Sequence, residues 1–199
     1  MPRSALLPLT LALAFAVGAC DRETTPPAQP QENSGAEKQT GAKDNGLTGT
    51  LDRSHARAAL PSIKVSKPDG TTLDLAALSG TPVLLNLWAT WCAPCVVEMP
   101  MLDALAGETE GKLRVITVSQ DLKGGEEVEP FFAEKKFAHL EPWLDPETEL
   151  SFAFADSGGV LPTTVLYGAD GKELWRMVGG YDWSSREARK LVAEGLDGR

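Results

Sequence analysis

The chain has 199 residues, of which 42% are hydrophobic and 24% charged, so it can form one compact domain with its own core but not two full domains. Its 19 Lys and Arg residues against 28 Asp and Glu give a formal net charge of −9. Because a negatively charged protein is repelled by phosphate backbones, no nucleic-acid partner is expected. Its three cysteines are too few for a disulfide-dense small protein. Because their number is odd, at least one of them is not in a disulfide bond within the chain.

The first 20 residues have the layout of a secretory signal. Arg3 precedes an apolar stretch over residues 5–17, and two small residues stand before Cys20. The stretch is shorter than the ~18–20 residues of a membrane-spanning helix, which favours a signal over a transmembrane anchor. Residues 17–20, V-G-A-C, resemble the bacterial lipobox, which implies cleavage before Cys20 and a diacylglycerol on its sulfur. The alternative is an ordinary cleaved signal that leaves Cys20 as a free thiol.

The segment that follows is expected to be a tether. Asp21 resembles the signal that keeps enteric lipoproteins at the inner membrane, so the expected location is the periplasmic face of that membrane. Beyond it the chain is rich in Pro, Gln, Glu, Ser and Thr, and such a segment cannot bury enough surface to offset its conformational entropy. The sequence therefore predicts a signal peptide over residues 1–19, a lipidated Cys20 with a disordered tether over 20–50, and a folded domain over 51–199.

Hydrophobic patterning in this domain indicates an α/β fold. Two alternating segments, residues 62–65 and 72–75, flank the turn sequence P-D-G at 68–70 and predict a hairpin at a sheet edge. Nearly continuous apolar runs at residues 83–88 and 113–118 predict strands that are covered on both faces. The two runs are therefore the expected centre of the sheet.

A helix is expected between these two central strands. Residues 94–106 have apolar side chains at helical spacing, with a kink expected at Pro100, and they complete a β-α-β unit. The other predicted elements are short helices at 126–136 and 147–154, strands at 163–167 and 173–178 joined across Asp170-Gly171, and a last helix to about Leu196 that begins with a capping box of Ser184 and Glu187.

The strongest local signal is a C-x-x-C pair where a buried strand passes into this helix. Cys92 stands at the expected helix N-terminus, where unpaired backbone N–H groups and the helix dipole favour a thiolate, so it is the expected nucleophile. Cys95, one turn further, is expected to resolve a mixed disulfide. Pro94 lies in the first turn, where a missing N–H costs little, and it stiffens the loop between the sulfurs. The pair itself would carry the electrons, so no cofactor is expected.

Three other kinds of site also use a pair of cysteines. A zinc site needs four ligands, and the remaining candidates are only the remote Cys20 and the histidines His55 and His139, so no metal is expected. A c-type haem site needs His directly after the second cysteine, and position 96 is Val, which excludes it. An inert structural disulfide fits an exported protein but does not explain the position at a strand-to-helix junction.

The motif around the cysteines resembles that of a known family. The sequence W-A-T-W-C-A-P-C at 88–95, followed by Glu98 and Pro100, is similar to the signature of the thioredoxin superfamily and, within it, of the TlpA/ResA/DsbE-like membrane-anchored thiol–disulfide oxidoreductases. The resemblance covers nearly all of residues 60–180. It implies a thioredoxin-like fold, with a central mixed sheet flanked by helices and an N-terminal β-hairpin extension.

The resemblance also implies partners. It suggests a reductant that receives electrons from an integral-membrane thiol transporter and passes them to client proteins with cysteine thiols or disulfides, such as apocytochrome c during cytochrome c maturation. The direction of electron flow stays open, because electrostatic detail around the sulfurs sets the reduction potential. A disulfide oxidant or isomerase is therefore an alternative.

A substrate-binding surface follows from the same resemblance. Pro162, in the run L-P-T-T, matches the family's cis-proline, and its loop, which includes Leu161, would face the C-x-x-C pair and hydrogen-bond an extended substrate segment. The cis bond rests on the resemblance alone, because only about 5% of X–Pro bonds are cis. Trp91 is expected to shield the sulfurs and contact partners, with Pro94 beside them.

A proton acceptor also follows from the resemblance. Glu98 matches the family's acidic residue near the cysteines, and its i+3 spacing puts it on the same helix face as Cys95. A partly buried carboxylate of raised pKa there would take the Cys95 proton. Thioredoxin has a buried Asp where this chain has Asn86, which cannot accept a proton at neutral pH. The alternative is that Glu98 is a solvated helix glutamate.

Two further activities occur on this fold. Relatives that deliver copper use C-x-x-x-C and a distant His, whereas the spacing here is C-x-x-C with no His or Met cluster, and His139 is expected to be a surface or packing residue. Thiol peroxidases of this fold have Thr three residues before the reactive cysteine, whereas this chain has Ala89 at that position. Both activities are kept as lesser alternatives.

Overall fold

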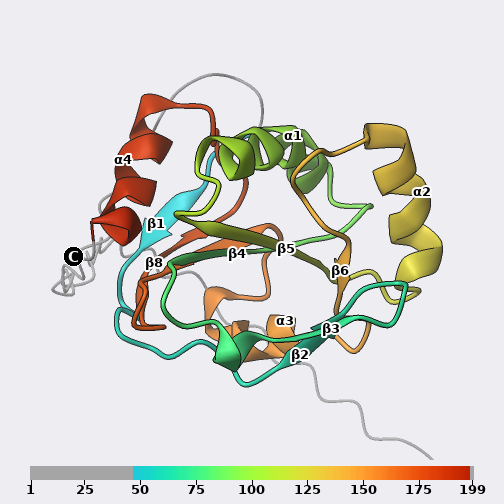
Figure 1. Cartoon of the computed structure of the whole chain (residues 1–199), viewed down its shortest axis with the longest axis horizontal. Coiled ribbons are helices and arrows are strands. Elements are labelled where there is room, and N and C mark those ends of the chain that lie inside the picture. The colour runs from blue at the N-terminus through green and yellow to red at the C-terminus, as the bar shows by residue number, and fades with distance from the viewer. Residues whose placement is uncertain (1–46, 198–199) are drawn as a thin grey trace, which may run out of the picture. The chain divides into compact units, whose positions relative to one another are not determined.

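The computed structural model describes residues 47–197, which form a mixed eight-stranded sheet with helices on both faces (Figure 1). The strand order is β1-β8-β7-β4-β5-β6-β2-β3. The strands are β1 (Thr50–Asp52), β2 (Lys64–Ser66), β3 (Thr72–Asp74), β4 (Val83–Trp88), β5 (Arg114–Ser119), β6 (Trp143–Leu144), β7 (Thr163–Tyr167) and β8 (Glu173–Val178). The helices are α1 (Ala93–Glu108), α2 (Gly125–Lys135), α3 (Glu149–Ala153) and α4 (Arg186–Leu196), with 3-10 turns at Leu75–Ala77 and Ala155–Ser157.

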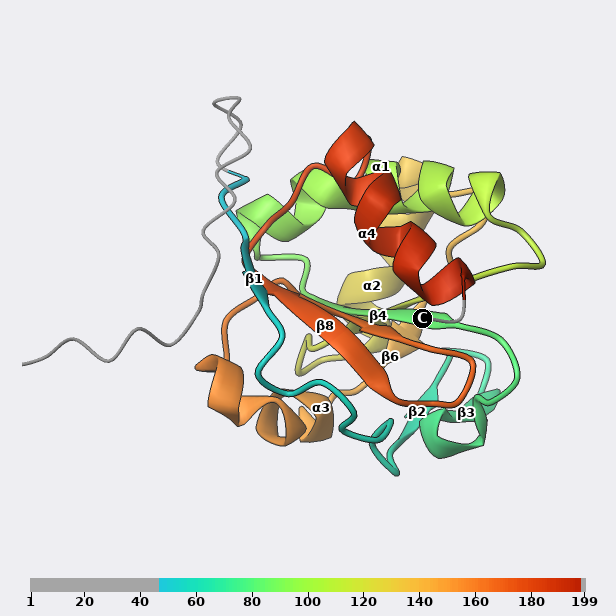
Figure 2. The same cartoon turned by 90° about the vertical axis from the view of Figure 1, so that its left-hand side faces the viewer.

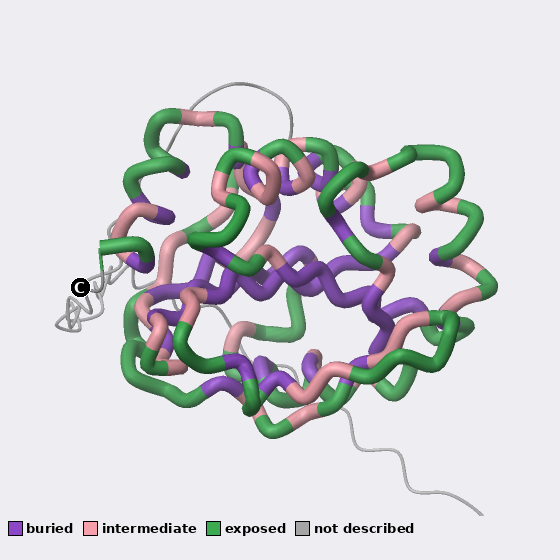
Figure 3. The backbone as a smooth tube through the Cα atoms, viewed as in Figure 1, coloured by how far each residue is buried: buried purple, intermediate pink, exposed green. Residues whose placement is uncertain are grey.

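Strand β4 lies at the centre of the sheet, as its continuous apolar sequence predicts. It pairs in parallel with β5 and antiparallel with β7, and all of its residues are buried (Figure 3). The β4-α1-β5 unit and the hairpin of β2 and β3 are confirmed, with β3 at the edge of the sheet. The α/β thioredoxin-like fold expected from the sequence is therefore correct.

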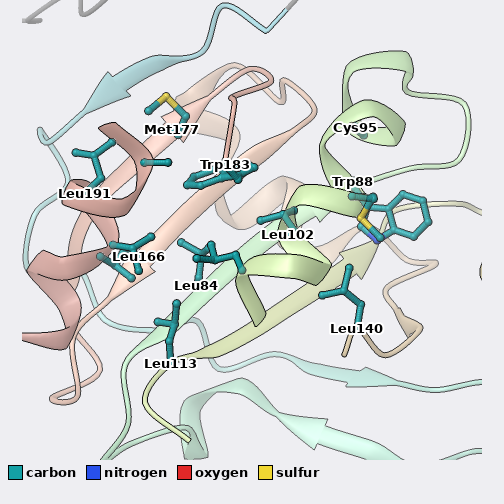
Figure 4. Close-up of a cluster of buried hydrophobic side chains, with 14 of the residues drawn as sticks. Leu84, Trp88, Cys95, Leu102, Leu113, Leu140, Leu166, Met177, Trp183 and Leu191 are labelled. Atoms are coloured by element: carbon teal, nitrogen blue, oxygen red, sulfur yellow. The ribbon is translucent and has the colours of Figure 1, made fainter. Parts of the chain in front are cut away.

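Two hydrophobic clusters cover the two faces of the sheet. Leu84 and Trp88 of β4 pack with α1 and α4 on one face (Figure 4), and the intervening Leu85 and Leu87 pack with α3 on the other. Figure 2 shows α1 and α4 together on one side of the sheet and α3 on the opposite side. Because side chains alternate along a strand, Asn86 must point to the same face as Leu84 and Trp88, toward α1.

The folded part begins before the predicted boundary at residue 51. Leu47 is buried, the Gly49 N–H donates to the Gly180 carbonyl at 2.8 Å, and β1 starts at Thr50 and pairs with β8. Residues 47–50 therefore belong to the domain rather than to the tether. A pattern-based boundary missed them because β1 is too short to show an alternation, and its position depends on backbone pairing with a distant strand. The predicted signal peptide and Cys20 lie outside the described residues.

Helix α4 begins one residue later than the capping box predicts. Ser185, not Ser184, is the N-cap, and its Oγ accepts from the Ala188 N–H at 3.0 Å. The Ser184 hydroxyl instead donates to Asp182 in the preceding turn. The predicted capping box of Ser184 and Glu187 is therefore wrong, because the Ser184 hydroxyl is bound to Asp182 and does not cap the helix.

Within residues 47–197, no helix has the length and apolar character needed to span a membrane.

The corrected cap predicts unequal effects for two neighbouring serines. Ser185→Ala should lower the free energy of unfolding by about 1 kcal/mol, because the first turn of α4 loses its side-chain acceptor. Ser184→Ala is the matched control and should cost less than about 0.5 kcal/mol, because its residue is exposed and outside the cap. Urea unfolding of both variants measures the difference. Equal effects, or a larger effect at Ser184, would contradict the assignment of the cap.

Candidate active site

Cys92 and Cys95 form a disulfide at the N-terminus of α1. Cys92 is the N-cap residue, where its carbonyl accepts from the Val96 N–H at 3.0 Å and starts the helix. Cys92 is 6% exposed and Cys95 is fully buried, so Cys92 is the cysteine that a partner can approach from solvent. Helix dipole and free backbone N–H groups both favour a thiolate on Cys92 when the pair is reduced.

Glu98 is buried one helical turn after Cys95, which excludes the alternative of a solvated helix glutamate. Its Oε1 accepts from Asn86 Nδ2 at 2.7 Å, and its Oε2 accepts from the Tyr181 N–H at 3.1 Å and from Trp183 Nε1 at 3.2 Å. Burial raises the pKa of Glu98 to about 7, although these hydrogen bonds oppose that effect. The carboxyl can therefore both hold and release a proton near neutral pH.

Asn86 holds the Glu98 carboxyl from the central strand. Its Nδ2 donates to Glu98 and also to Thr164 Oγ1 at 2.9 Å, while its Oδ1 has no hydrogen-bond partner. Asn86 and Thr164 are register partners on β4 and β7, which explains how residues 78 positions apart meet. Because position 86 holds an amide rather than a carboxylate, Glu98 is the carboxyl group of this hydrogen-bonded set of Asn86, Glu98 and Thr164.

The loop before β7 lies at the same end of the sheet as the cysteines. Because β4 and β7 are antiparallel, with Leu87 opposite Thr163, the last residues of β4 lie beside the first residues of β7. The Leu161–Pro162 bond in this loop is cis, as the family resemblance implies. The Pro162 carbonyl accepts from the Gly179 N–H at 2.9 Å, which ties the loop to the end of β8.

The other predicted contact residues surround the pair. Trp91 is 69% exposed, so it is not held in a packed core, whereas Trp88 is fully buried. Pro94 is half-buried in the first turn of α1, and a Cβ added at Gly180 would lie 3.0 Å from its Cβ, so the two backbones approach closely here. Binding roles for Trp91, Pro94, Leu161 and Pro162 remain predictions.

A buried carboxylate that the sequence analysis missed holds the loop before the cysteines. Asp121 accepts from the Thr90 N–H at 2.9 Å, from Thr90 Oγ1 at 2.7 Å and from Ser119 Oγ at 2.7 Å. Asp121 thus fixes the segment that carries Trp91 and leads into Cys92. A signal was present in the sequence, because polar residues directly after a buried parallel strand often lie beside the end of the neighbouring strand.

The histidines do not join the cysteine pair. His139 is exposed, and its backbone N–H donates to Asp103 on α1, about 16 Å along the helix from Cys92. His55 faces Asp52 and Asp156 instead. Residues 47–197 contain no group of three or more His, Cys, Asp or Glu side chains arranged to hold a metal ion. The geometry of this part of the chain gives no support to a copper site of two cysteines and a distant histidine.

Comparisons with known proteins agree with the geometry. The model of the AhpC/TSA family matches residues 56–172. The chain is 30% identical over 119 residues to the thiol-disulfide oxidoreductase ResA of Bacillus cereus. The alignment covers 60% of this chain and 67% of that protein.

Solved structures show the same fold. A Chlorobium tepidum protein assigned as the thiol:disulfide interchange protein DsbE matches with a TM-score of 0.62 and 22% identity, over 71% of this chain and 97% of that one. The exposed lipoprotein thioredoxin of Streptococcus pneumoniae matches with a TM-score of 0.56 and 22% identity, over 67% of this chain and 99% of that one. At these identities the two matches support the fold alone.

Proposed function

Because this chain belongs to the AhpC/TSA family and is a thiol–disulfide oxidoreductase whose redox group is the Cys92–Cys95 disulfide, we propose that it reduces disulfides in client proteins outside the cytoplasm. The observation that carries the proposal is the buried Glu98 carboxyl one turn after Cys95. With a pKa of about 7, it can accept the Cys95 proton at neutral pH. A reductant needs the resulting thiolate, because that thiolate displaces the client from Cys92.

The proposed reaction has two exchange steps. The Cys92 thiolate attacks one sulfur of the client disulfide, and the other client sulfur leaves as a thiolate and takes a proton from solvent. Cys95 then gives its proton to Glu98 and attacks the Cys92 sulfur, which forms the Cys92–Cys95 disulfide and releases the second client sulfur. Two electrons pass from the pair to the client. A membrane-embedded thiol donor would return the oxidised pair to the dithiol.

The proposed location is the periplasmic face of the inner membrane, with lipid on Cys20. Support comes from the lipobox-like sequence V-G-A-C at 17–20 and from Asp21 after it. Cys20→Ala should move the protein from the membrane fraction to the soluble fraction after cell lysis. If the variant still pellets with membranes, the lipid anchor on Cys20 is wrong.

The proposed clients are proteins whose cysteines must be reduced before use, and apocytochrome c is the example that the family resemblance suggests. The formal net charge of −9 favours a client or donor surface that is neutral or basic. Reduction of a disulfide-bonded peptide with the C-x-x-C-H sequence of a haem-attachment site, followed by thiol labelling, tests this client class directly. A client-specific rate should exceed the rate with a small disulfide.

The direction of electron flow is tested by the reduction potential of the Cys92–Cys95 pair. The mature chain with Cys20→Ala would be equilibrated against thiol buffers and read by Trp fluorescence, because Trp88 and Trp91 lie just before Cys92. A potential near or below roughly −220 mV, the range of glutaredoxins and thioredoxin, supports a reductant. A potential near about −120 mV, like that of a strong periplasmic oxidant, would overturn the proposed direction and favour a disulfide oxidant or isomerase.

A further inference from the structure

Residues 179–183, which follow β8 and are called the supporting segment below, hold the Glu98 carboxyl. The Tyr181 N–H and Trp183 Nε1 donate to Glu98 Oε2 at 3.1 Å and 3.2 Å. Trp183 is 1% exposed, so its indole is fixed in the core. Movement of the supporting segment would therefore weaken two hydrogen bonds that stabilise the ionised form of this carboxyl.

The supporting segment also contacts the cis-proline loop and α1. The Gly179 N–H donates to the Pro162 carbonyl at 2.9 Å. A Cβ added at Gly180 would lie 3.0 Å from Pro94 Cβ, so this glycine packs on the first turn of α1. Gly179 has a φ of 92°, which is the left-handed conformation that favours glycine. The supporting segment thus adjoins the substrate loop, the cysteine helix and the buried carboxyl.

The first residues of the folded domain pack directly on this segment. The Gly49 N–H donates to the Gly180 carbonyl at 2.8 Å. A Cβ added at Gly49 would lie 2.8 Å from the Gly179 carbonyl oxygen and 3.0 Å from that of Gly180. Leu47 is buried, and its Cδ2 would lie 2.7 Å from a Cβ added at Gly180. Residues 47–49 are therefore in close contact with two consecutive glycines.

These contacts lie beyond the pairing of β1 with β8. The register of the two strands runs from Thr50 opposite Val178 to Asp52 opposite Arg176, at the edge of the sheet (Figure 2). Residues 47–49 precede this pair and cover the glycines that follow β8. Because glycine has no side chain with which to pack, the position of this part of the chain depends on what covers it.

We propose that residues 47–49 are a positioning element for the reaction: by packing on Gly179 and Gly180, they hold the Tyr181 and Trp183 donors against Glu98. They act through the supporting segment and are not catalytic. The inference rests on the proposed function in giving the Cys95 proton to Glu98. Since the predicted tether would join the domain at these residues, membrane attachment and the proton acceptor would depend on the same contact.

The direction of the effect follows from the groups around Glu98. Burial and hydrogen bonds set its pKa, and no charged side chain among the described residues contributes to it. In the oxidised protein Cys95 is in the disulfide and does not titrate. The Tyr181 hydroxyl stays neutral because burial raises its pKa, and Asp182 and Glu187 act on that hydroxyl. Weaker donors around a carboxyl that stays buried should raise the pKa of Glu98 above about 7.

The kinetic test uses Leu47→Ala in the mature chain that carries Cys20→Ala. A rise of about 0.5 to 1 in the pKa of Glu98 should slow single-turnover release of a peptide disulfide about 3- to 10-fold at pH 6 and leave it unchanged at pH 9, where the carboxyl is ionised in both proteins. Gly49→Ala should have the same effect, because its Cβ would press on the carbonyls of residues 179 and 180. Leu60→Ala is the matched control, because Leu60 is equally buried but its N–H donates to the Gly171 carbonyl instead. Its ratio of release rates at pH 6 and pH 9 should be that of the wild-type protein.

Urea unfolding of the oxidised proteins gives a second readout that does not involve the reaction. A higher pKa in the folded state alone means that the variant loses more stability than the wild-type protein as pH rises through that pKa. The deficit of Leu47→Ala relative to wild type should therefore be larger at pH 9 than at pH 5. The increase should be about 0.7 to 1.4 kcal/mol, which is the expected rise in pKa converted to free energy. The deficit of Leu60→Ala should be the same at both pH values.

Two results would overturn the inference. One is a Leu47→Ala deficit that is equal at pH 5 and pH 9, because a merely structural loss does not depend on the titration of Glu98. The other is a pH-dependent deficit in Leu60→Ala as large as that in Leu47→Ala. If the unfolding data show the expected difference but release in the wild-type protein does not depend on Glu98, the contact holds Glu98 as inferred, and the proposed proton acceptor is wrong.

Discussion

Cys92→Ser should abolish thiol–disulfide exchange, whereas Cys95→Ser should stop the reaction halfway, with the client bound to the protein. The reason is the unequal burial of the two sulfurs, since Cys92 is 6% exposed and Cys95 is fully buried. Of the two cysteines in residues 47–197, Cys92 is the one that a client disulfide can reach, and once the mixed disulfide has formed, Cys95 is the one placed to release the client. Turnover should fall to the uncatalysed rate in both variants, although for different reasons.

Mass spectrometry under non-reducing conditions separates the two variants. After incubation with a peptide disulfide, Cys95→Ser should carry one covalently attached peptide that dithiothreitol removes, and Cys92→Ser should carry none. Both variants lose the Cys92–Cys95 disulfide, so the reduced wild-type protein is the control for any change in stability. A peptide adduct on Cys92→Ser, in an amount similar to that on Cys95→Ser, would show that the nucleophile has been assigned to the wrong cysteine.

The sequence predicted the elements whose pattern is long enough to be unambiguous. Strand β4 was evident because its six residues are nearly all apolar, and such a run is typical of a strand buried on both faces. Strands β1 and β6 were missed because they have three and two residues, and each exists only by pairing with β8 or β5 and β2. Without a turn sequence beside them, segments of two or three residues are too short for a local pattern to specify as strands.

In the candidate site, too, the residues that a local motif contains were predicted, and those that only folding brings together were not. The C-x-x-C pair, Glu98 and Pro162 were identified because they belong to a local motif or to a family resemblance. The partners of Glu98 were not, because Tyr181 and Trp183 lie more than 80 positions away and reach its carboxylate only in the folded chain.

Glu98 should also make the stability of the oxidised protein depend on pH. Its carboxyl has a pKa of about 7 in the folded protein and an ordinary value of 4.5 when exposed, so the folded state binds the proton more tightly. The stabilising contribution is full below about pH 4.5, falls as pH rises toward 7, and is absent above that. This difference in pKa corresponds to about 3 kcal/mol. In Glu98→Gln, this part of the pH dependence should disappear.

The amide introduced by Glu98→Gln can be accommodated. Asn86 Nδ2 donates to the carboxylate, while Asn86 Oδ1 has no partner, so rotation of the Asn86 amide would offer an acceptor to the new NH₂ group. The variant should therefore fold. Urea unfolding at pH 5 and pH 8 measures the effect as the change in the difference between the two proteins, which should move by about 2 to 3 kcal/mol in favour of the variant at pH 8, because part of the contribution is already lost at pH 5. The same difference at both pH values would contradict the raised pKa of Glu98.

The same substitution should slow the release of the client. Without a carboxylate to accept its proton, Cys95 must deprotonate to solvent, and loss of a positioned base typically costs about 100-fold or more. Single-turnover reduction of a peptide disulfide should show a pH profile in which the inflection near 7 belongs to the wild-type protein and is missing from Glu98→Gln. Attack by Cys92 should be little changed, so the mixed disulfide should accumulate transiently. A release rate that Glu98→Gln leaves unchanged from pH 6 to pH 9 would remove Glu98 from the mechanism, and the buried carboxyl would then only tie α1 to the segment around Tyr181 and Trp183.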